Sequence, residues 1–248
     1  MAVNSWRVIN LGRRVVRRAG IGLVGLLALV QMGGALSTTA SMLVSLAFYA
    51  MAFGFRFAAG FVLLLLVHEL GHVAASRIVG LRAKGPTFIP FIGAVISLNR
   101  APVNAKMTAN IAIGGPAAGT LSALVCLAFY LWSDSTLMLV LAYTACLLNL
   151  FNLIPCAPLD GERIAAAISP RLWWLGSLVI GIVFLYTHNI LVLIIFLFSL
   201  FALWRGEEEQ DERYYQLTAT QRLNVAWWYF GLLTVLALTT LYTMDLLK

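Results

Sequence analysis

Charge is scarce in this chain of 248 residues. Asp, Glu, Lys and Arg together make up 11% of the sequence, whereas 61% of its residues are hydrophobic. This balance excludes a soluble globular protein and predicts a polytopic membrane protein. The sequence also offers no internal repeat, no linker and no room for a sizeable soluble domain. We therefore expect a single membrane-embedded domain.

Cysteine is scarce as well. Cys126, Cys146 and Cys156 lie in or beside apolar segments, without CxxC spacing. They provide no disulfide framework, and we expect them to pack as small hydrophobic side chains. Because Cys156 neighbours the second motif described below, a thiolate metal ligand at this position is a minor alternative.

Positive charge is concentrated at the N-terminus. The net charge is +7, and five arginines crowd the first 18 residues. Such an arm could bind nucleic acid, but the apolar run 21–32 follows at once, which favours a cytoplasmic N-terminus in contact with anionic lipid. We expect no nucleic-acid partner. The arm and the run also resemble a secretory signal, but the apolar sequence that continues beyond them disfavours cleavage.

Negative charge is rarer still. Five of the ten acidic residues cluster at 207–212, and two lie in a polar loop and in the C-terminal tail. Only Glu69, Asp160 and Glu162 remain. The first two of these belong to sequence motifs.

An HExxH motif, His68 to His72, lies inside the apolar stretch 57–79. On a helix, residues four apart share one face, so His68 and His72 can bind one metal ion. Glu69 is placed to take a proton from a water that the metal activates. Ionisable side chains at bilayer depth are costly and indicate a functional site. The alternative, two histidines satisfied in a helical core, is disfavoured because the motif rarely arises by chance.

The hydropathy pattern predicts an all-α polytopic membrane protein of about seven transmembrane helices. We expect a basic arm (1–20), a membrane-embedded core (21–204), a charged cytoplasmic loop (205–224) and an extra C-terminal helix (225–248). The run 21–32 could be interfacial or begin a bent span. The predicted spans are 35–55, 57–79, 107–132, 137–154, 172–186, 190–204 and 227–242.

Two segments depart from plain helical spans. Residues 85–99 are apolar but carry two prolines and two glycines among strand formers, so we expect a short re-entrant β-hairpin after the HExxH helix. An ordinary cytoplasmic loop is the alternative. Residues 114–119, Gly-Gly-Pro-Ala-Ala-Gly, indicate close helix packing rather than a ligand site.

Asp160 is the expected third metal ligand. A catalytic zinc ion takes three protein ligands and keeps a fourth position for water. Asp160 follows the span 137–154, and Pro155 and Pro158 break the helix before it. Its carboxylate therefore arrives at the same side of the bilayer as His72. A helix cap or a charge at headgroup level is the alternative role for this residue.

The two motifs together, HExxH and Asn152-x-x-Pro-x-x-Pro-Leu-Asp-Gly, resemble those of the site-2 protease family of intramembrane zinc metalloproteases, over residues 41–169. The resemblance implies one zinc ion per chain, bound by His68, His72 and Asp160. It implies that Glu69 is the general base. It also implies that the second motif and the re-entrant element handle substrate, where we single out Asn152, Phe91, Ile92 and Gly93.

The resemblance further implies hydrolysis of peptide bonds in a transmembrane protein or peptide, within or near the bilayer. It implies a multi-pass protein of the cell membrane, surrounded by membrane lipid. The chain departs from the family pattern because it shows no PDZ or CBS domain, has Glu162 where many members have glycine, and adds a final span. Two alternatives stay open, a catalytically silent protein that binds membrane helices and a metal-ion transporter. The intact motif disfavours the first, and the lack of further intramembrane carboxylates or histidines disfavours the second.

Overall fold

The structure, a computed structural model, describes residues 35–89, 93–206 and 212–248. The basic arm, the apolar run 21–32, Phe91, Ile92 and most of the acidic cluster lie outside the described residues. The described chain confirms the all-α prediction. Its elements are α2 (Ala35–Phe53), α3 (Phe55–Ile78), β1 (Thr87–Ile89), β2 (Gly93–Val95), α4 (Ala105–Ser133), α5 (Thr136–Asn152), α6 (Asp160–Ile168), α7 (Leu172–Thr187), α8 (Ile190–Gly206), the 3-10 helix η1 (Glu212–Tyr215) and α9 (Ala219–Leu246).

Local sequence explains where the helices begin and end. Helix α4 begins after Asn104, whose side-chain oxygen accepts a hydrogen bond from the Met107 amide at 2.9 Å. Helix α9 begins with a capping box between Thr218 and Gln221. Gly54 separates α2 from α3 at φ +84°, a backbone conformation that glycine adopts without strain. The apolar runs between these signals therefore become separate helices.

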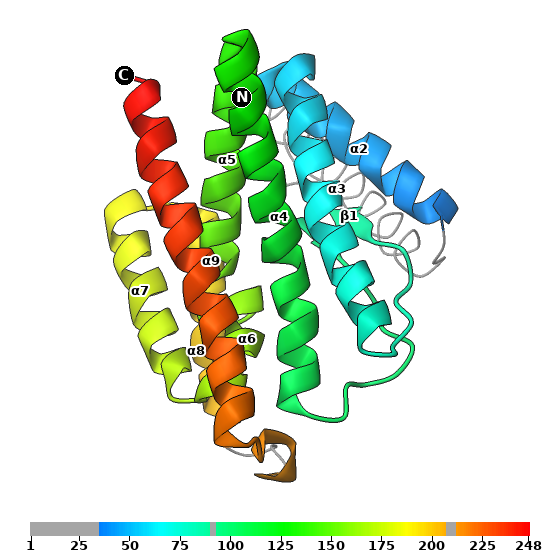
Figure 1. The fold of residues 1–248 in the computed structure, drawn as a ribbon, viewed down its shortest axis with the longest axis vertical. Helices are drawn as coiled ribbons and strands as arrows, with labels where there is room; N and C mark the ends of the chain where they lie inside the picture. The colour runs from blue at the N-terminus through cyan, green and yellow to red at the C-terminus, as the bar shows by residue number, and fades with distance from the viewer. Residues whose placement is uncertain (1–34, 90–92, 207–211) are drawn as a thin grey trace, which may run out of the picture.

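Helix α4 is the central element of the bundle. It contacts α3, α5, α6 and α9. Helix α2 packs against α3 and β1, whereas α7 and α8 pair with each other on the other side of the bundle (Figure 1). The main hydrophobic core joins α4, α5, α6 and α9, with Ile164 and Leu236 completely buried in it. Elements that lie far apart in the sequence therefore meet around α4.

Several helices have the length and composition of membrane spans. Among the described residues, α3, α4 and α9 are long and apolar enough to cross a bilayer. Four shorter apolar helices, α2, α5, α7 and α8, occupy the positions of the other predicted spans. The chain is a membrane protein, and the total of about seven spans stays a prediction.

The segment after the HExxH helix contains the two strands. β1 and β2 are antiparallel, with Phe88 opposite Ala94. Phe88 is completely buried, and its amide donates to the Ser41 hydroxyl of α2 at 3.0 Å. Helix α2 therefore holds one side of β1, while β2 pairs with the other side. That the strand pair re-enters the bilayer stays a prediction.

Glycines allow α3 and α4 to lie in backbone contact. A Cβ atom on Gly71 of α3 would lie 2.2 Å from the carbonyl oxygen of Gly114 in α4. A Cβ atom on Gly114 would lie 2.5 Å from the carbonyl oxygen of Gly71. No side chain fits at either position without moving a helix, which confirms close helix packing at Gly114, whereas Gly115 of the same run faces His68 and His72.

Candidate metal centre

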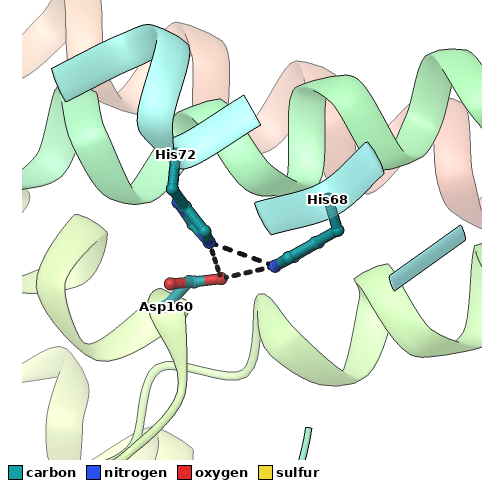
Figure 2. A group of neighbouring side chains, drawn as sticks. All are labelled: His68, His72 and Asp160. Atoms are coloured by element: carbon teal, nitrogen blue, oxygen red, sulfur yellow. Dashed lines mark hydrogen bonds and ion pairs between the residues drawn. The ribbon is translucent and has the colours of Figure 1, made fainter. Parts of the chain in front are cut away.

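Three side chains of metal-ligand type converge between α3 and α6. His68 and His72 lie one turn apart on α3, and Asp160 is the first residue of α6. The two Nε2 atoms are 3.1 Å apart, and each lies 3.2 Å from Asp160 Oδ2. Figure 2 shows both imidazoles directed at the carboxylate. In the described ranges, no other group of three His, Cys, Asp or Glu side chains could hold a metal ion.

The spacing and the donor types fit zinc. In a tetrahedral site with Zn–N distances of about 2.0–2.1 Å, two ligand atoms lie about 3.3 Å apart. The separations of 3.1 and 3.2 Å match three corners of such a tetrahedron. Two imidazoles and one carboxylate are a ligand set found in catalytic zinc sites, and they leave a fourth position open. The three predicted ligands therefore fit a zinc ion.

Asn149 of α5 determines which nitrogen of His68 faces the centre. The Asn149 side-chain nitrogen donates to the Ala145 carbonyl at 2.7 Å, so its oxygen is the atom that lies 2.8 Å from His68 Nδ1. This oxygen can only accept, and Nδ1 must therefore carry the hydrogen. His68 Nε2 keeps its lone pair for the metal. Asn149 is 1% exposed, so solvent does not compete for this bond.

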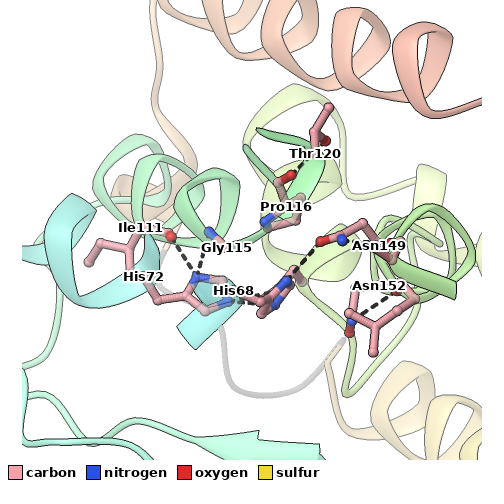
Figure 3. A network of polar contacts seen from close by, with 11 residues as sticks. His68, His72, Ile111, Gly115, Pro116, Thr120, Asn149 and Asn152 are labelled. Atoms are coloured by element: carbon pink, nitrogen blue, oxygen red, sulfur yellow. Dashed lines mark hydrogen bonds and ion pairs between the residues drawn. The ribbon is translucent and has the colours of Figure 1, made fainter. Parts of the chain in front are cut away.

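A backbone carbonyl of α4 does the same for His72. His72 Nδ1 lies 2.8 Å from the Ile111 carbonyl oxygen, which can only accept. The hydrogen is therefore on Nδ1, although the Gly115 amide also lies 3.2 Å from this atom. Figure 3 shows these contacts at the Nδ1 atoms, from α5 to His68 and from α4 to His72. Both Nε2 atoms are thus available to one metal ion.

Two glycines of α4 make room for this arrangement. A Cβ atom on Gly115 would lie 2.2 Å from His72 Nε2 and 2.7 Å from His68 Nε2. A Cβ atom on Gly119 would lie 2.1 Å from the Asn149 side-chain oxygen. Larger residues at these positions would displace the ligands or the residue that orients one of them.

Glu69 is buried beside the two ligands, with 7% of its surface exposed. Its carboxyl group interacts electrostatically with both imidazoles, with Asp160 and with Arg163. An ionisable group is costly at such a position unless partners offset the lost hydration. Glu69 is therefore a buried carboxyl group close to the three candidate ligands.

Asp160 is held in its ionised form. Burial alone would raise the pKa of this carboxyl, but imidazoles that carry a proton on Nε2 as well as on Nδ1, His72 above all, hold the pKa below its ordinary value. An ionised carboxylate is the form that binds a metal. Two residues further on, burial raises the pKa of the Glu162 carboxyl, and the charge of Arg163 offsets part of this effect.

The other predicted residues are not part of the cluster. The Asn152 side chain donates to the Leu148 carbonyl of its own helix at 3.1 Å, and Gly93 begins β2. Phe91 and Ile92 lie outside the described residues. Cys156 is buried but does not belong to the group of ligand atoms, so the thiolate alternative finds no support.

Asn149 was missed by the sequence analysis. A polar residue in the middle of the apolar run 137–154 is the one signal that could have indicated it. The motif gave weight to Asn152 instead, one turn further along α5.

We expect Asn149→Leu, which keeps the side-chain size but removes the acceptor, to weaken zinc binding about tenfold to a hundredfold. The reason is that His68 would lose the bond that keeps hydrogen on Nδ1. The measurement is a competition titration of detergent-purified protein with a chromophoric chelator. Asn152→Leu is the matched control and should leave zinc affinity unchanged. Equal effects of the two substitutions would contradict the assignment.

Comparisons with known proteins agree with the motifs. Residues 56–136 match the family model Peptidase family M50. The chain is 31% identical over 159 residues to a zinc metalloprotease of Methanocaldococcus jannaschii, an alignment that covers 58% of this chain and 46% of that protein. It is 39% identical over 111 residues to the protein Rip3 of Mycobacterium tuberculosis, an alignment that covers 42% of this chain and 28% of that protein. The chain thus spans about half the length, or less, of these curated relatives.

A solved structure, the site-2 protease from Methanocaldococcus jannaschii, aligns with 70% of this chain and 89% of that chain. The sequence identity is 22% and the TM-score is 0.47. The family match covers α3 and α4 and so contains His68, Glu69 and His72. The resemblance to peptidase family M50 is therefore confirmed for residues 56–136.

Proposed function

We propose that this protein is an intramembrane zinc metalloprotease that hydrolyses peptide bonds of transmembrane proteins or peptides, within or near the bilayer. The observation that carries the proposal is the convergence of His68 and His72 with Asp160, next to buried Glu69, in a bundle of apolar helices. We propose one zinc ion per chain at this position. The name of the Methanocaldococcus jannaschii relative, a zinc metalloprotease, supports the same activity.

Each residue of the centre has a role in this proposal. His68, His72 and Asp160 would hold the zinc ion, which supplies a more acidic water and a polarised peptide carbonyl. Glu69 accepts the proton that the attacking water loses, and then transfers it to the leaving amine. Asn149 and the Ile111 carbonyl keep the two imidazoles in the tautomer that this chemistry needs.

The substrate has to be extended near the centre, because a helix shields its own carbonyls with hydrogen bonds. We propose that the segment to be cleaved pairs with the outer edge of β2. The amide of Phe88 points away from β2, toward Ser41. Ala94 lies opposite Phe88 in the antiparallel register, so its own amide points away from β1. Phe91, Ile92 and Gly93 at this element, and Asn152 on α5, stay our candidates for substrate contact.

We also propose an orientation in the membrane. Arg77, Arg82 and Lys84 follow the HExxH motif at the end of α3, which by the positive-inside rule puts this end in the cytoplasm. The N-terminal arm 1–20 and the loop 205–224 would then be cytoplasmic too. They flank the core 21–204 in the sequence, and the extra span 225–248 follows the loop. The cell membrane is the proposed location.

Two other functions would use the same fold. A silent relative that binds membrane helices would have no need of Glu69, whose burial is costly. A metal-ion transporter would need further ligands along a path through the membrane, and the described residues contain one ligand cluster only. Both observations favour the protease.

We expect Glu69→Gln to retain zinc and to abolish cleavage, because an amide keeps the shape of the side chain but cannot accept the proton. Zinc content and cleavage of a panel of labelled single-span peptides in detergent would be measured together, with the wild type as control. A fully active variant would contradict the assignment of Glu69 as the general base.

We expect Ala94→Pro to slow cleavage of the same peptides while zinc content stays at the wild-type level. Proline removes the amide that faces the incoming strand but leaves the bonds between β1 and β2 in place. The quantity to compare is kcat/KM at equal zinc loading. Unchanged kcat/KM would exclude strand addition at this edge.

A further inference from the structure

Asp160 depends on a support that the two histidines do not need. His68 and His72 belong to one long helix, whereas Asp160 begins a helix of nine residues that follows a non-helical segment. The position of its carboxylate therefore depends on whatever fixes the beginning and the end of α6. The contacts at both ends lead to α9.

At the beginning of α6, a buried carbonyl links Asp160 to α9. A Cβ atom on Gly161, the residue after Asp160, would lie 2.3 Å from the Leu153 carbonyl oxygen, so the chain next to the ligand rests directly on this group. The Tyr229 hydroxyl of α9 donates to the same oxygen at 2.7 Å. Leu153 is completely buried and Tyr229 is 4% exposed, so water cannot replace this bond.

At the end of α6, an arginine of α9 binds the free carbonyls. Arg222 Nη1 donates to the Ile168 carbonyl at 2.7 Å and to the Ala167 carbonyl at 3.4 Å. Its Nη2 donates to the Tyr215 carbonyl of η1 at 2.8 Å. A cation at this position satisfies the last carbonyls of the helix and interacts favourably with its dipole.

The two contacts belong to one face of one helix. Arg222 and Tyr229 are seven residues, or about two turns, apart, so their side chains leave α9 on the same side. Helix α9 contacts α4, α5 and α6, the elements that surround the metal centre. It lies outside residues 56–136, the part of the chain that matches the peptidase family model.

We propose that α9 is a working part of the metal centre, in which Tyr229 and Arg222 are positioning residues that hold Asp160 in place for zinc. The inference rests on the proposed zinc site. Without these two contacts, α6 keeps its sequence and its ligand, but the carboxylate loses its fixed distance to the imidazoles. The effect on zinc should therefore pass through Asp160 alone.

The test is a double-mutant cycle on zinc affinity, measured by chelator competition on the full-length purified protein. Tyr229→Phe should weaken zinc binding about tenfold, since it leaves a buried carbonyl without its donor. Tyr242→Phe, on the exposed side of α9, is the matched control and should change nothing. In the Asp160→Ala background, Tyr229→Phe should have no further effect.

Arg222→Lys gives an independent measurement if Tyr229→Phe does not fold, because it keeps the charge but loses the two-nitrogen fork. It should weaken zinc binding with Asp160 present and have no effect without it. Unchanged affinity in both variants would overturn the inference. So would equal losses with and without Asp160, which would mean that the bundle has merely loosened. If Asp160→Ala itself left zinc affinity unchanged, the proposed zinc site would be wrong as well.

Discussion

The cost of burying ionisable groups among apolar helices is the constraint on which this structure depends. Two imidazoles and the Glu69 carboxyl lie in a helix that is otherwise suited to lipid, and each needs partners that replace water. For the two imidazoles these partners are the amide oxygen of Asn149 and the Ile111 carbonyl. These contacts replace the lost hydration and also fix the tautomer of both imidazoles, which is the tautomer that metal binding requires.

Helix α4 makes this arrangement possible because it has glycines where α3, the imidazoles and Asn149 need space. Gly114 lets α3 approach, Gly115 leaves room for both imidazoles, and Gly119 leaves room for Asn149. The bundle can therefore bring α3, α5 and α6 together around the three candidate ligands. Helix α9 supports α6 from both ends, because Tyr229 donates to the carbonyl of Leu153 before α6 and Arg222 donates to the carbonyl at the end of α6.

Sequence reasoning could bring the three candidate ligands together because their spacing encodes geometry. Four residues separate His68 from His72, and helix period alone puts them on one face. Asp160 was found from its motif and from chain direction, and its distance to the imidazoles fits that prediction. Asn149 was missed because its role depends on how α5 is rotated against α3, which hydropathy does not specify. The contribution of α9 depends on contacts between residues far apart in sequence, 54 positions from Arg222 to Ile168 and 76 from Tyr229 to Leu153.

The most direct test of this account is the zinc content of the detergent-purified protein, measured by elemental analysis for the wild type and for Asp160→Ala side by side. The account predicts one zinc ion per wild-type chain, lost or greatly weakened in the variant, because two distant segments build one site. A wild type without zinc after purification in zinc-containing buffer would contradict it. A variant that keeps its zinc would show that Asp160 is not a ligand.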